Sequence, residues 1–248
     1  LSISISNQRE TTVIWDKETG LPVMNAIVWQ CNRGETICSE LRQRGHGDDI
    51  QRKTGLVLSP YFPAAKASWI VENFGSTTDR STWLFGTIDT WLIWKLTGGS
   101  VHVTDYTNAS RTQLFDIRSL SWDEELLCLF GLSPKMMPVV HASDTVMGYT
   151  TTDLFDRKIP IAGVLGDSHA AFFGQMCTQP GSVKTTYGTG SSVMMHVGHA
   201  APENAKNVVI SIGYATANEV AYVLEGNINS SGDTIQWLVD GLGIVDSV

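Results

Sequence analysis

The chain has 248 residues, 42% of them hydrophobic and 17% charged, a balance typical of a globular protein with a sizeable core. Its 17 Lys and Arg against 25 Asp and Glu give a formal net charge of −8, which argues against a protein that binds the phosphate backbone of nucleic acids. No apolar run is long enough to span a bilayer. From the acidic charge we expect no nucleic acid as a partner, and from the lack of such a run we expect no membrane.

The first residues, 1–6, alternate between apolar and polar side chains. This pattern predicts a strand that is already under way at Leu1, and the chain stops at Val248 just after a predicted helix. We therefore expect both ends to be cuts in a longer protein.

Strand and helix signals alternate over the first two thirds of the chain. Apolar and β-branched runs predict strands at residues 11–15, 23–30, 101–103 and 159–165, with a turn at residues 16–20 joining the first two. Helices are predicted at residues 66–74, 87–97 and 168–177, and from a capping box at residues 121–124 to Gly131. Polar residues surround positions 42–51, and Pro60 and Pro63 mark a loop.

After Pro180 and Gly181 the predicted secondary structure changes to strands at residues 182–187, 192–197, 208–214 and 219–225, followed by a helix at residues 231–242. The mixture predicts an α/β protein. This change in predicted secondary structure indicates a domain boundary near residues 177–181.

Four cysteines, Cys31, Cys38, Cys128 and Cys177, lie far apart and form no C-x-x-C pair. This spacing favours neither a zinc cluster nor a dense disulfide framework, so we expect a reduced, cytoplasmic protein. His196 and His199 have no third ligand close by in the sequence, and no metal site is predicted from them.

The strongest local signal is an apolar strand that runs into Gly166-Asp167, with a helix beginning at once. A carboxylate at the carboxyl end of a sheet strand is well placed to take a proton from a substrate hydroxyl. On the local pattern alone, a plainer role is favoured: Asp167 would be the N-cap of the following helix.

Three further features each allow a functional and a plainer interpretation. Gly188-Thr189-Gly190 between two strands would let backbone N–H groups approach a phosphate, or would be an ordinary hairpin turn. Arg9 and Glu10 after the opening strand would bind a polyol from both sides, or would form an exposed ion pair. Trp29 and Tyr61 would face a ligand, or would only pack the core and a loop.

Longer stretches carry a resemblance to a known family. They lie, in order, at residues 7–12, 25–30, 55–62, 84–95, 103–112, 166–167, 173–175, 187–190 and 224–226. In their residues and in their order along the chain, these stretches resemble the FGGY carbohydrate kinases. The resemblance covers essentially the whole chain, and within that family it is strongest to the glycerol kinases.

The resemblance implies an actin-like, ribonuclease H-like ATPase fold with a mixed sheet flanked by helices, truncated here at both ends. Residues 1–177 would form most of the N-terminal substrate-binding domain, and residues 178–248 the start of the C-terminal nucleotide-binding domain. The implied reaction is ATP- and Mg²⁺-dependent phosphorylation of a primary hydroxyl of a small polyol, such as glycerol. The complete enzyme would be a possible homo-oligomer.

The resemblance also implies site roles. Asp167 matches the catalytic base, and the substrate-binding positions are Arg9, Glu10, Trp29, Tyr61, Asp167 and Ser168. The nucleotide-binding positions are Gly188, Thr189, Gly190, Gly232 and Gln236. No residue is assigned to the metal, because the family's Asp-x-Gly-Thr-Thr stretch that helps hold Mg²⁺ is expected before Leu1.

Two departures bear on the substrate. Glycerol kinases usually have Gln where this chain has Ser168, and an aromatic residue after the Gly-Thr-Gly turn where it has Ser191-Ser192. A roomier, more polar pocket would suit a sibling FGGY kinase acting on a pentulose or tetritol, of the xylulose or erythritol type. A non-catalytic relative is the other alternative, and we expect the 248-residue chain alone to be inactive.

Overall fold

The computed structural model describes residues 1–75, 79–203, 208–228 and 230–246. Its strands are β1 (Ile3–Asn7), β2 (Val13–Asp16), β3 (Trp83–Gly86), β4 (Val103–Asp105), β5 (Phe115–Asp116), β6 (Ser121–Trp122), β7 (Val139–His141), β8 (Gly148–Tyr149), β9 (Pro160–Gly166), β10 (Val183–Tyr187), β11 (Ser191–Gly198), β12 (Val209–Ala215) and β13 (Val220–Ile228).

Its helices are α1 (Glu35–Gln43), α2 (Gly47–Thr54), α3 (Pro63–Phe74), α4 (Ile88–Leu96), α5 (Tyr106–Ala109), α6 (Glu124–Leu129), α7 (Asp167–Gly174) and α8 (Gly232–Gln236). A 3₁₀ turn, η1, covers Pro134–Met136, and a π-helical turn, η2, covers Trp237–Gly241. The predicted α/β class is confirmed. None of the helices described is long and apolar enough to cross a membrane.

A small mixed sheet sets the position of the site. Strand β1 pairs in parallel with β9, which pairs in the antiparallel sense with β8, giving the order β1-β9-β8. In the register, Asn7 lies opposite Gly166, so the carboxyl ends of β1 and β9 lie side by side. The loop after β1 and the start of α7 therefore leave the sheet at the same edge.

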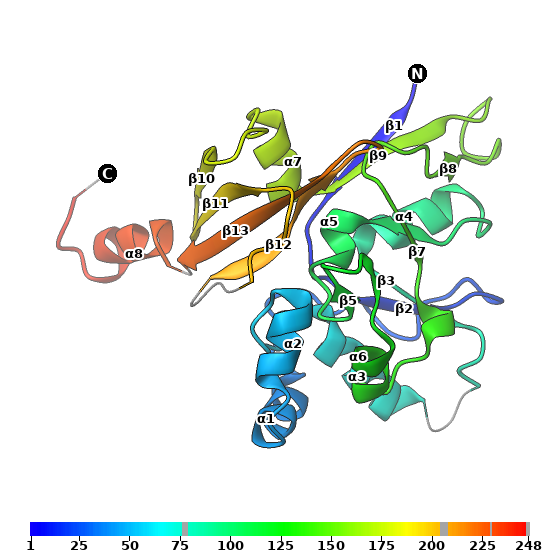
Figure 1. Ribbon diagram of the computed structural model, residues 1–248, viewed down its shortest axis with the longest axis horizontal. Helices are drawn as coiled ribbons and strands as arrows, with labels where there is room; N and C mark the ends of the chain where they lie inside the picture. Colours follow the sequence, from blue (N-terminus) through cyan, green and yellow to red (C-terminus); the bar gives the residue numbers. More distant parts are fainter. Residues whose placement is uncertain (76–78, 204–207, 229, 247–248) are drawn as a thin grey trace.

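Strands β10 to β13 form a separate antiparallel sheet with the order β10-β11-β13-β12. Helix α7 packs against it through Phe172, which is buried with Met194 and Tyr214. Strand β12 packs against α5 on the other side, through a core that includes Phe115 and Ile212. Figure 1 shows this sheet between α7 and α2, with α8 leading away from its end.

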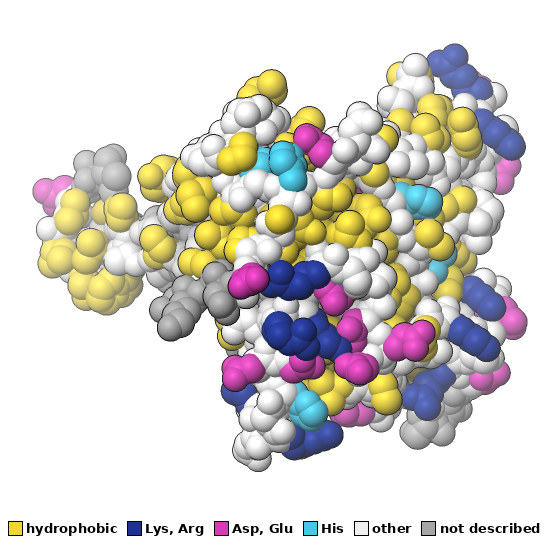
Figure 2. Space-filling view, in the orientation of Figure 1, with side chains coloured by type: hydrophobic (Ala, Val, Ile, Leu, Met, Phe, Trp, Pro, Cys, Tyr) yellow, Lys and Arg dark blue, Asp and Glu magenta, His cyan; other side chains and the backbone are white. Residues whose placement is uncertain are grey.

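The largest apolar core lies under helices α1, α2, α3 and α6, where it includes Ile14, Leu41, Ile70 and Phe130. A second aromatic group joins β2 to α4: Trp15 contacts Trp91 and Trp94 with ring centroids 5.2 and 5.8 Å apart. On the face shown in Figure 2, Lys and Arg side chains lie among Asp and Glu side chains, so that face has no wide area of one charge.

Five predictions of local structure differ from the structure. Residues 23–30 form no strand: the only β contacts there are isolated bridges, Trp15 to Pro22 and Thr12 to Ile27. The brief strand predicted at residues 101–103 lies two residues later, as β4. The polar residues around 42–51 fall on α1 and α2, which are amphipathic and bury Leu41 and Ile50.

The predicted capping box is also wrong. Ser121 pairs with Asp116 in the short β5–β6 hairpin, and the N-cap of α6 is Asp123, whose side chain accepts from the Leu126 N–H. The last predicted helix, residues 231–242, is α8 continued by the π-helical turn rather than one regular helix.

Candidate active site

Hydrogen bonds fix the two chain segments that leave the β1–β9 edge. The amides of Asn7 and Asn108 exchange hydrogen bonds at 2.9 and 3.2 Å. The Gly166 N–H donates to the Thr107 hydroxyl at 3.0 Å, and that hydroxyl in turn donates to the buried carboxylate of Asp105. Helix α5 therefore anchors both the approach to Arg9 and the turn into Asp167.

Asp167 is the first residue of α7, and the N-cap is Gly166. The alternative that Asp167 is itself the N-cap is thus wrong, although its Oδ1 accepts from the Ser168 N–H at 2.6 Å. The Asp167 side chain is 55% exposed and its Oδ1 lies 3.7 Å from Nε of Arg9. The carboxylate is open to a ligand and close to a cation.

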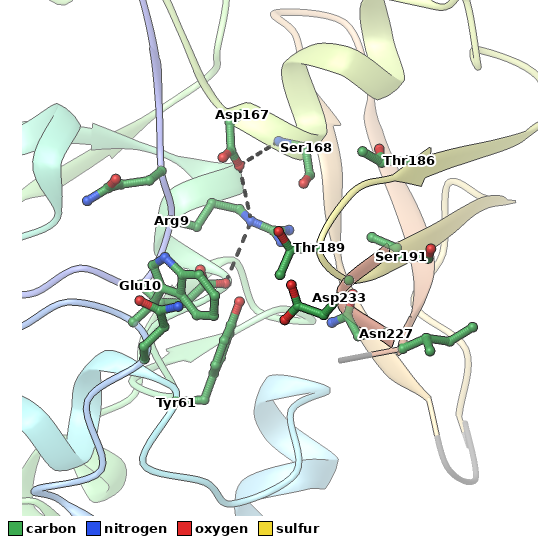
Figure 3. Close-up of a pocket in the computed structure, with 16 residues that line it drawn as sticks. Arg9, Glu10, Tyr61, Asp167, Ser168, Thr186, Thr189, Ser191, Asn227 and Asp233 are labelled. Carbon is green, nitrogen blue, oxygen red and sulfur yellow. Dashed lines mark hydrogen bonds and ion pairs between the residues drawn. The ribbon is translucent and has the colours of Figure 1, made fainter. Parts of the chain in front are cut away.

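A cavity of about 520 Å³ lies at this edge. Its lining includes every residue predicted for substrate binding: Arg9, Glu10, Trp29, Tyr61, Asp167 and Ser168. From the predicted nucleotide set it includes Thr189 and Gly190, while Gly188, Gly232 and Gln236 are not part of the lining. Figure 3 shows Asp167, Arg9, Glu10 and Tyr61 on one side of this space and Thr189 and Asp233 facing them.

Two aromatic rings form part of the wall. Trp29 is 38% exposed, and its ring meets that of Tyr61 edge-on, with centroids 5.7 Å apart. Burial, with a smaller contribution from the charge of Glu10, raises the pKa of Tyr61 to about 12. The Tyr61 hydroxyl therefore keeps its proton and is available as a hydrogen-bond donor to a ligand.

The backbone at Glu10 is unusual. Its φ is +62°, and the Thr11 N–H donates to the Arg9 carbonyl at 2.8 Å, so Glu10 is the central residue of a tight three-residue turn. A non-glycine residue with positive φ is uncommon, and such strain often occurs at binding sites. Lys66 supports the turn by donating to the Glu10 carbonyl at 3.3 Å.

Arg9 and Glu10 form an ion pair, as the plainer interpretation proposed, but the pair is buried rather than exposed. Arg9 Nε lies 3.7 Å from Glu10 Oε1, and the side chains are 6% and 2% exposed. Two further buried charges complete the group. Arg9 donates to both carboxylate oxygens of Glu225 at 3.0 and 2.9 Å, and Arg111 donates to Glu10 at 2.7 Å and to Glu225 at 2.9 Å.

Sequence reasoning missed Glu225 and Arg111. Both lie in stretches that carried the family resemblance, but neither was assigned a role. A signal was present: Glu225 is a lone carboxylate in the apolar strand β13. A charge in such a strand needs a buried partner.

The charges of this group are mutually stabilised. Burial alone would raise the pKa of Glu225, but the guanidinium groups of Arg111 and Arg9 outweigh it and hold that pKa far below its usual range. Burial also opposes the charge of Arg9, yet Glu225 and Glu10 raise its pKa well above the ordinary value. His169, whose Nδ1 lies 3.5 Å from Arg9, has its pKa lowered far below 6.5 by burial and by Arg9, so it is neutral.

The Gly188–Gly190 turn is held against α8. The Gly232 N–H donates to the Gly188 carbonyl at 3.0 Å, and the Asp233 N–H donates to the Thr189 carbonyl at 3.2 Å. A Cβ at Gly232 would lie 2.4 Å from the Gly188 oxygen, so only glycine permits this approach. Gln236 lies further along α8, where its amide donates to Asp240 at 3.0 Å.

Within the described ranges, no group of three or more His, Cys, Asp or Glu side chains is arranged to hold a metal ion. The rings of His196 and His199 lie 5.6 Å apart, and His199 is 3.8 Å from Glu219. The cavity lining does contain three carboxylates, those of Glu10, Asp167 and Asp233, and Glu10 is already paired with Arg9 and Arg111. Mg²⁺ in phosphoryl-transfer sites is commonly bound by one or two carboxylates together with substrate phosphates and water.

Comparison with known proteins identifies the family of the chain. A model of the FGGY family of carbohydrate kinases, N-terminal domain, matches residues 1–174. A glycerol kinase of Pseudothermotoga lettingae is 50% identical over 249 residues, which cover 99% of this chain and 50% of the relative. One of Desulforamulus reducens is 51% identical over 250 residues, with 99% and 50% covered.

Solved structures give the same result. The crystal structure of Plasmodium falciparum glycerol kinase with ADP superposes with a TM-score of 0.93 at 35% identity, covering 99% of this chain and 50% of that one. A xyloylose kinase of Brucella ovis, at 22% identity and a TM-score of 0.85, shares the fold.

The fold is thus the actin-like α/β fold of the carbohydrate kinases, as predicted. The chain belongs to the FGGY family of carbohydrate kinases. It spans about half the length of the curated relatives it matches.

Proposed function

We propose that the complete protein transfers the γ-phosphoryl group of ATP to a primary hydroxyl of a small polyol, in the manner of a glycerol kinase. The observation that carries the proposal is the half-exposed carboxylate of Asp167, which lines the same cavity as Arg9, Glu10, Trp29 and Tyr61. An alcohol in this cavity would meet a proton acceptor, a cation and an aromatic wall together.

In the proposed reaction, Asp167 accepts the proton of the substrate hydroxyl. The hydroxyl oxygen forms a bond to the γ-phosphorus as the bond from that phosphorus to the bridging oxygen of ADP breaks. Arg9 donates to substrate hydroxyls, Glu10 accepts from them, and Trp29 covers the C–H face of the polyol. Ser168, next to Asp167 on the cavity wall, is a further polar contact for the substrate.

For the nucleotide, we propose that Gly188, Thr189 and Gly190 form the phosphate-binding turn. Thr189 and Gly190 would contact phosphate directly, and Gly232 would support them through its hydrogen bond to Gly188. Gln236 is kept as a nucleotide contact on the family resemblance alone. Mg²⁺, with Asp167 and Asp233 as the nearest carboxylates, would neutralise charge on the phosphates.

These roles follow the proposed division into a substrate-binding domain at residues 1–177 and the start of a nucleotide-binding domain at residues 178–248. We also propose a cytoplasmic location, which the four free cysteines favour because disulfides are rare in that compartment. Assembly of the complete enzyme into a homo-oligomer remains a prediction.

A longer substrate is the second candidate. Ser168 and Ser192 both line the cavity, and the Ser192 Oγ is buried without a hydrogen-bond partner among the described residues. A free buried hydroxyl favours a substrate with an additional hydroxyl to satisfy it. A tetritol or pentulose would supply one, whereas glycerol is shorter.

The test is an assay of ADP release by the complete gene product against glycerol, four- and five-carbon polyols and ketoses, with Asp167→Asn as the variant. We expect turnover with at least one substrate, and a kcat for D167N that is lower by about 10²- to 10⁴-fold. Because the Asp167 side chain is largely exposed, the Tm of D167N should equal that of the wild type. A wild-type protein inactive on the whole panel would favour the non-catalytic alternative, whereas a fully active D167N would show that Asp167 is not the base.

A further inference from the structure

Two arginines and two glutamates close a buried ring of charges beside the cavity. We call Arg9, Glu10, Arg111 and Glu225 the charge ring. Around it, Arg9 contacts Glu225, Glu225 contacts Arg111, Arg111 contacts Glu10, and Glu10 returns to Arg9. The two positive and two negative charges balance, so none of the four is buried without an opposite charge in contact.

The ring fixes the plane of the Arg9 guanidinium. Its two terminal nitrogens, Nη1 and Nη2, each donate to one oxygen of Glu225, at 3.0 and 2.9 Å. Two parallel hydrogen bonds define an orientation as well as a distance. The remaining edge, at Nε, then lies 3.7 Å from Asp167 Oδ1 and 3.7 Å from Glu10 Oε1, as Figure 3 shows.

Glu225 does not reach the cavity itself. Its side chain is fully buried, and it is not among the residues that line the cavity. It also accepts from Arg111 at 2.9 Å, and Arg111 holds Glu10 through a separate hydrogen bond. One carboxylate on β13 therefore controls the orientation of both charged residues that follow β1.

We propose that Glu225 is a positioning residue for substrate binding: through its paired hydrogen bonds it aims Arg9, and through Arg111 it aims Glu10, at the polyol hydroxyls. The proposal rests on the proposed function, because it assumes that Arg9 and Glu10 bind the polyol. Glu225 itself touches neither substrate nor nucleotide.

The test compares Glu225→Gln with the wild type in the complete gene product. The amide removes one acceptor and the negative charge, which frees the guanidinium to rotate. We expect the KM for the polyol to rise by about 10- to 100-fold, the range for losing hydrogen bonds to a charged group, while the KM for ATP changes by less than about threefold. An unchanged polyol KM would overturn the proposal.

Asp89→Asn is the matched control. Asp89 is equally buried and also accepts two side-chain hydrogen bonds, from Thr87 and Thr104, but it does not line the cavity. This variant should lose stability without changing the polyol KM. If it raises that KM as much as E225Q does, the effect reflects general loosening and not positioning by Glu225.

A double-mutant cycle asks whether Glu225 acts through Arg9. Lysine at position 9 is unable to form the paired hydrogen bonds, so in an Arg9→Lys background E225Q should change the polyol kcat/KM by less than it does with Arg9 present. The effect that is left in this background is the one that passes through Arg111 to Glu10. Effects that multiply fully would overturn the proposal. Should E225Q fail to fold, Glu225→Asp keeps the charge with a shorter reach, and the same increase in polyol KM, to a smaller extent, is expected.

A crystal structure of the variant separates this proposal from the proposed function. We expect the Arg9 guanidinium in E225Q to leave its position between Asp167 and Glu10, whatever the activity. If it stays, the positioning role is wrong. If it moves and the wild-type protein phosphorylates no polyol, the positioning role stands and the kinase proposal fails.

Discussion

Gly166 and Arg9 are in such close contact that a Cβ atom on Gly166 would lie 2.7 Å from Cγ of Arg9. The Arg9 side chain thus crosses the backbone at the end of β9, one residue before Asp167. Because Glu225 clamps the far end of Arg9, the side chain has little freedom to move aside. The absence of a side chain at position 166 is what lets the two site residues approach each other.

We therefore predict that Gly166→Ala pushes Arg9 out of place. Forcing a methyl group into this contact should destabilise the protein by about 1–3 kcal/mol and raise the polyol KM. The measurements are Tm and steady-state kinetics of the complete gene product. Gly174→Ala at the other end of α7 is the control, since nothing lies within 4 Å of its Cβ position. Equal effects of the two variants would contradict the prediction.

A second prediction concerns the size of the substrate. Ser192→Phe should fill part of the cavity, and it should lower kcat/KM for four- and five-carbon substrates relative to glycerol by about tenfold or more. Val193→Phe is the control, because consecutive strand residues point to opposite faces and Val193 does not line the cavity. If S192F leaves the ratio of kcat/KM for longer substrates to kcat/KM for glycerol unchanged, the longer substrates do not extend toward Ser192.

A third prediction is a pH dependence of stability that comes from His102. Burial lowers its pKa to about 4, although its ring contacts the Phe85 carbonyl at 2.8 Å. Between pH 6.5 and 4, His102 is protonated in the unfolded chain but stays neutral in the folded chain. The folded state therefore becomes less stable as the pH falls through this range. For a pKa of about 4 in the folded chain against 6.5 in the unfolded chain, the free energy of unfolding falls by about 3 kcal/mol in total.

His102→Gln measures this contribution, because glutamine keeps a donor for the Phe85 carbonyl and does not titrate. Urea unfolding of both proteins at pH 7 and pH 4 should show the wild type losing more stability than H102Q. Parallel losses in the two proteins would mean that His102 titrates normally in the folded state.

Local patterns predicted the elements that position the site, whereas the roles of its residues came from the family resemblance. Alternating residues identified β1, an apolar run identified β9, and the Gly166-Asp167 step marked the helix start. Parallel pairing of β1 with β9 then places Arg9 and Asp167 together. The capping residue of α6 was mistaken because Ser121 and Asp123 are both good caps, and only the pairing of Ser121 with Asp116 decides between them.

The charge ring was beyond local reasoning. Only the Arg9–Glu10 pair is local: Arg9 and Glu225 lie 216 positions apart, and Glu10 and Arg111 lie 101 apart, so no short stretch of sequence contains either of these pairs. The strand expected at residues 23–30 failed for a related reason. Its contacts with residues 12–14 include a hydrogen bond from the Val23 N–H to the Ile14 carbonyl and an isolated bridge from Ile27 to Thr12. The bridge just before it is at Pro22, which has no N–H for a regular ladder.

The long separation between Arg9 and Glu225 also has a consequence for how the protein folds. Closing a loop of 216 residues carries a large entropic penalty, so contacts of this kind form late. During synthesis Arg9 leaves the ribosome long before Glu225, and until then its charge is stable only in water. The Arg9 clamp therefore cannot close before β13 has been synthesised, and a chain that stops short of Glu225 lacks the carboxylate that holds Arg9.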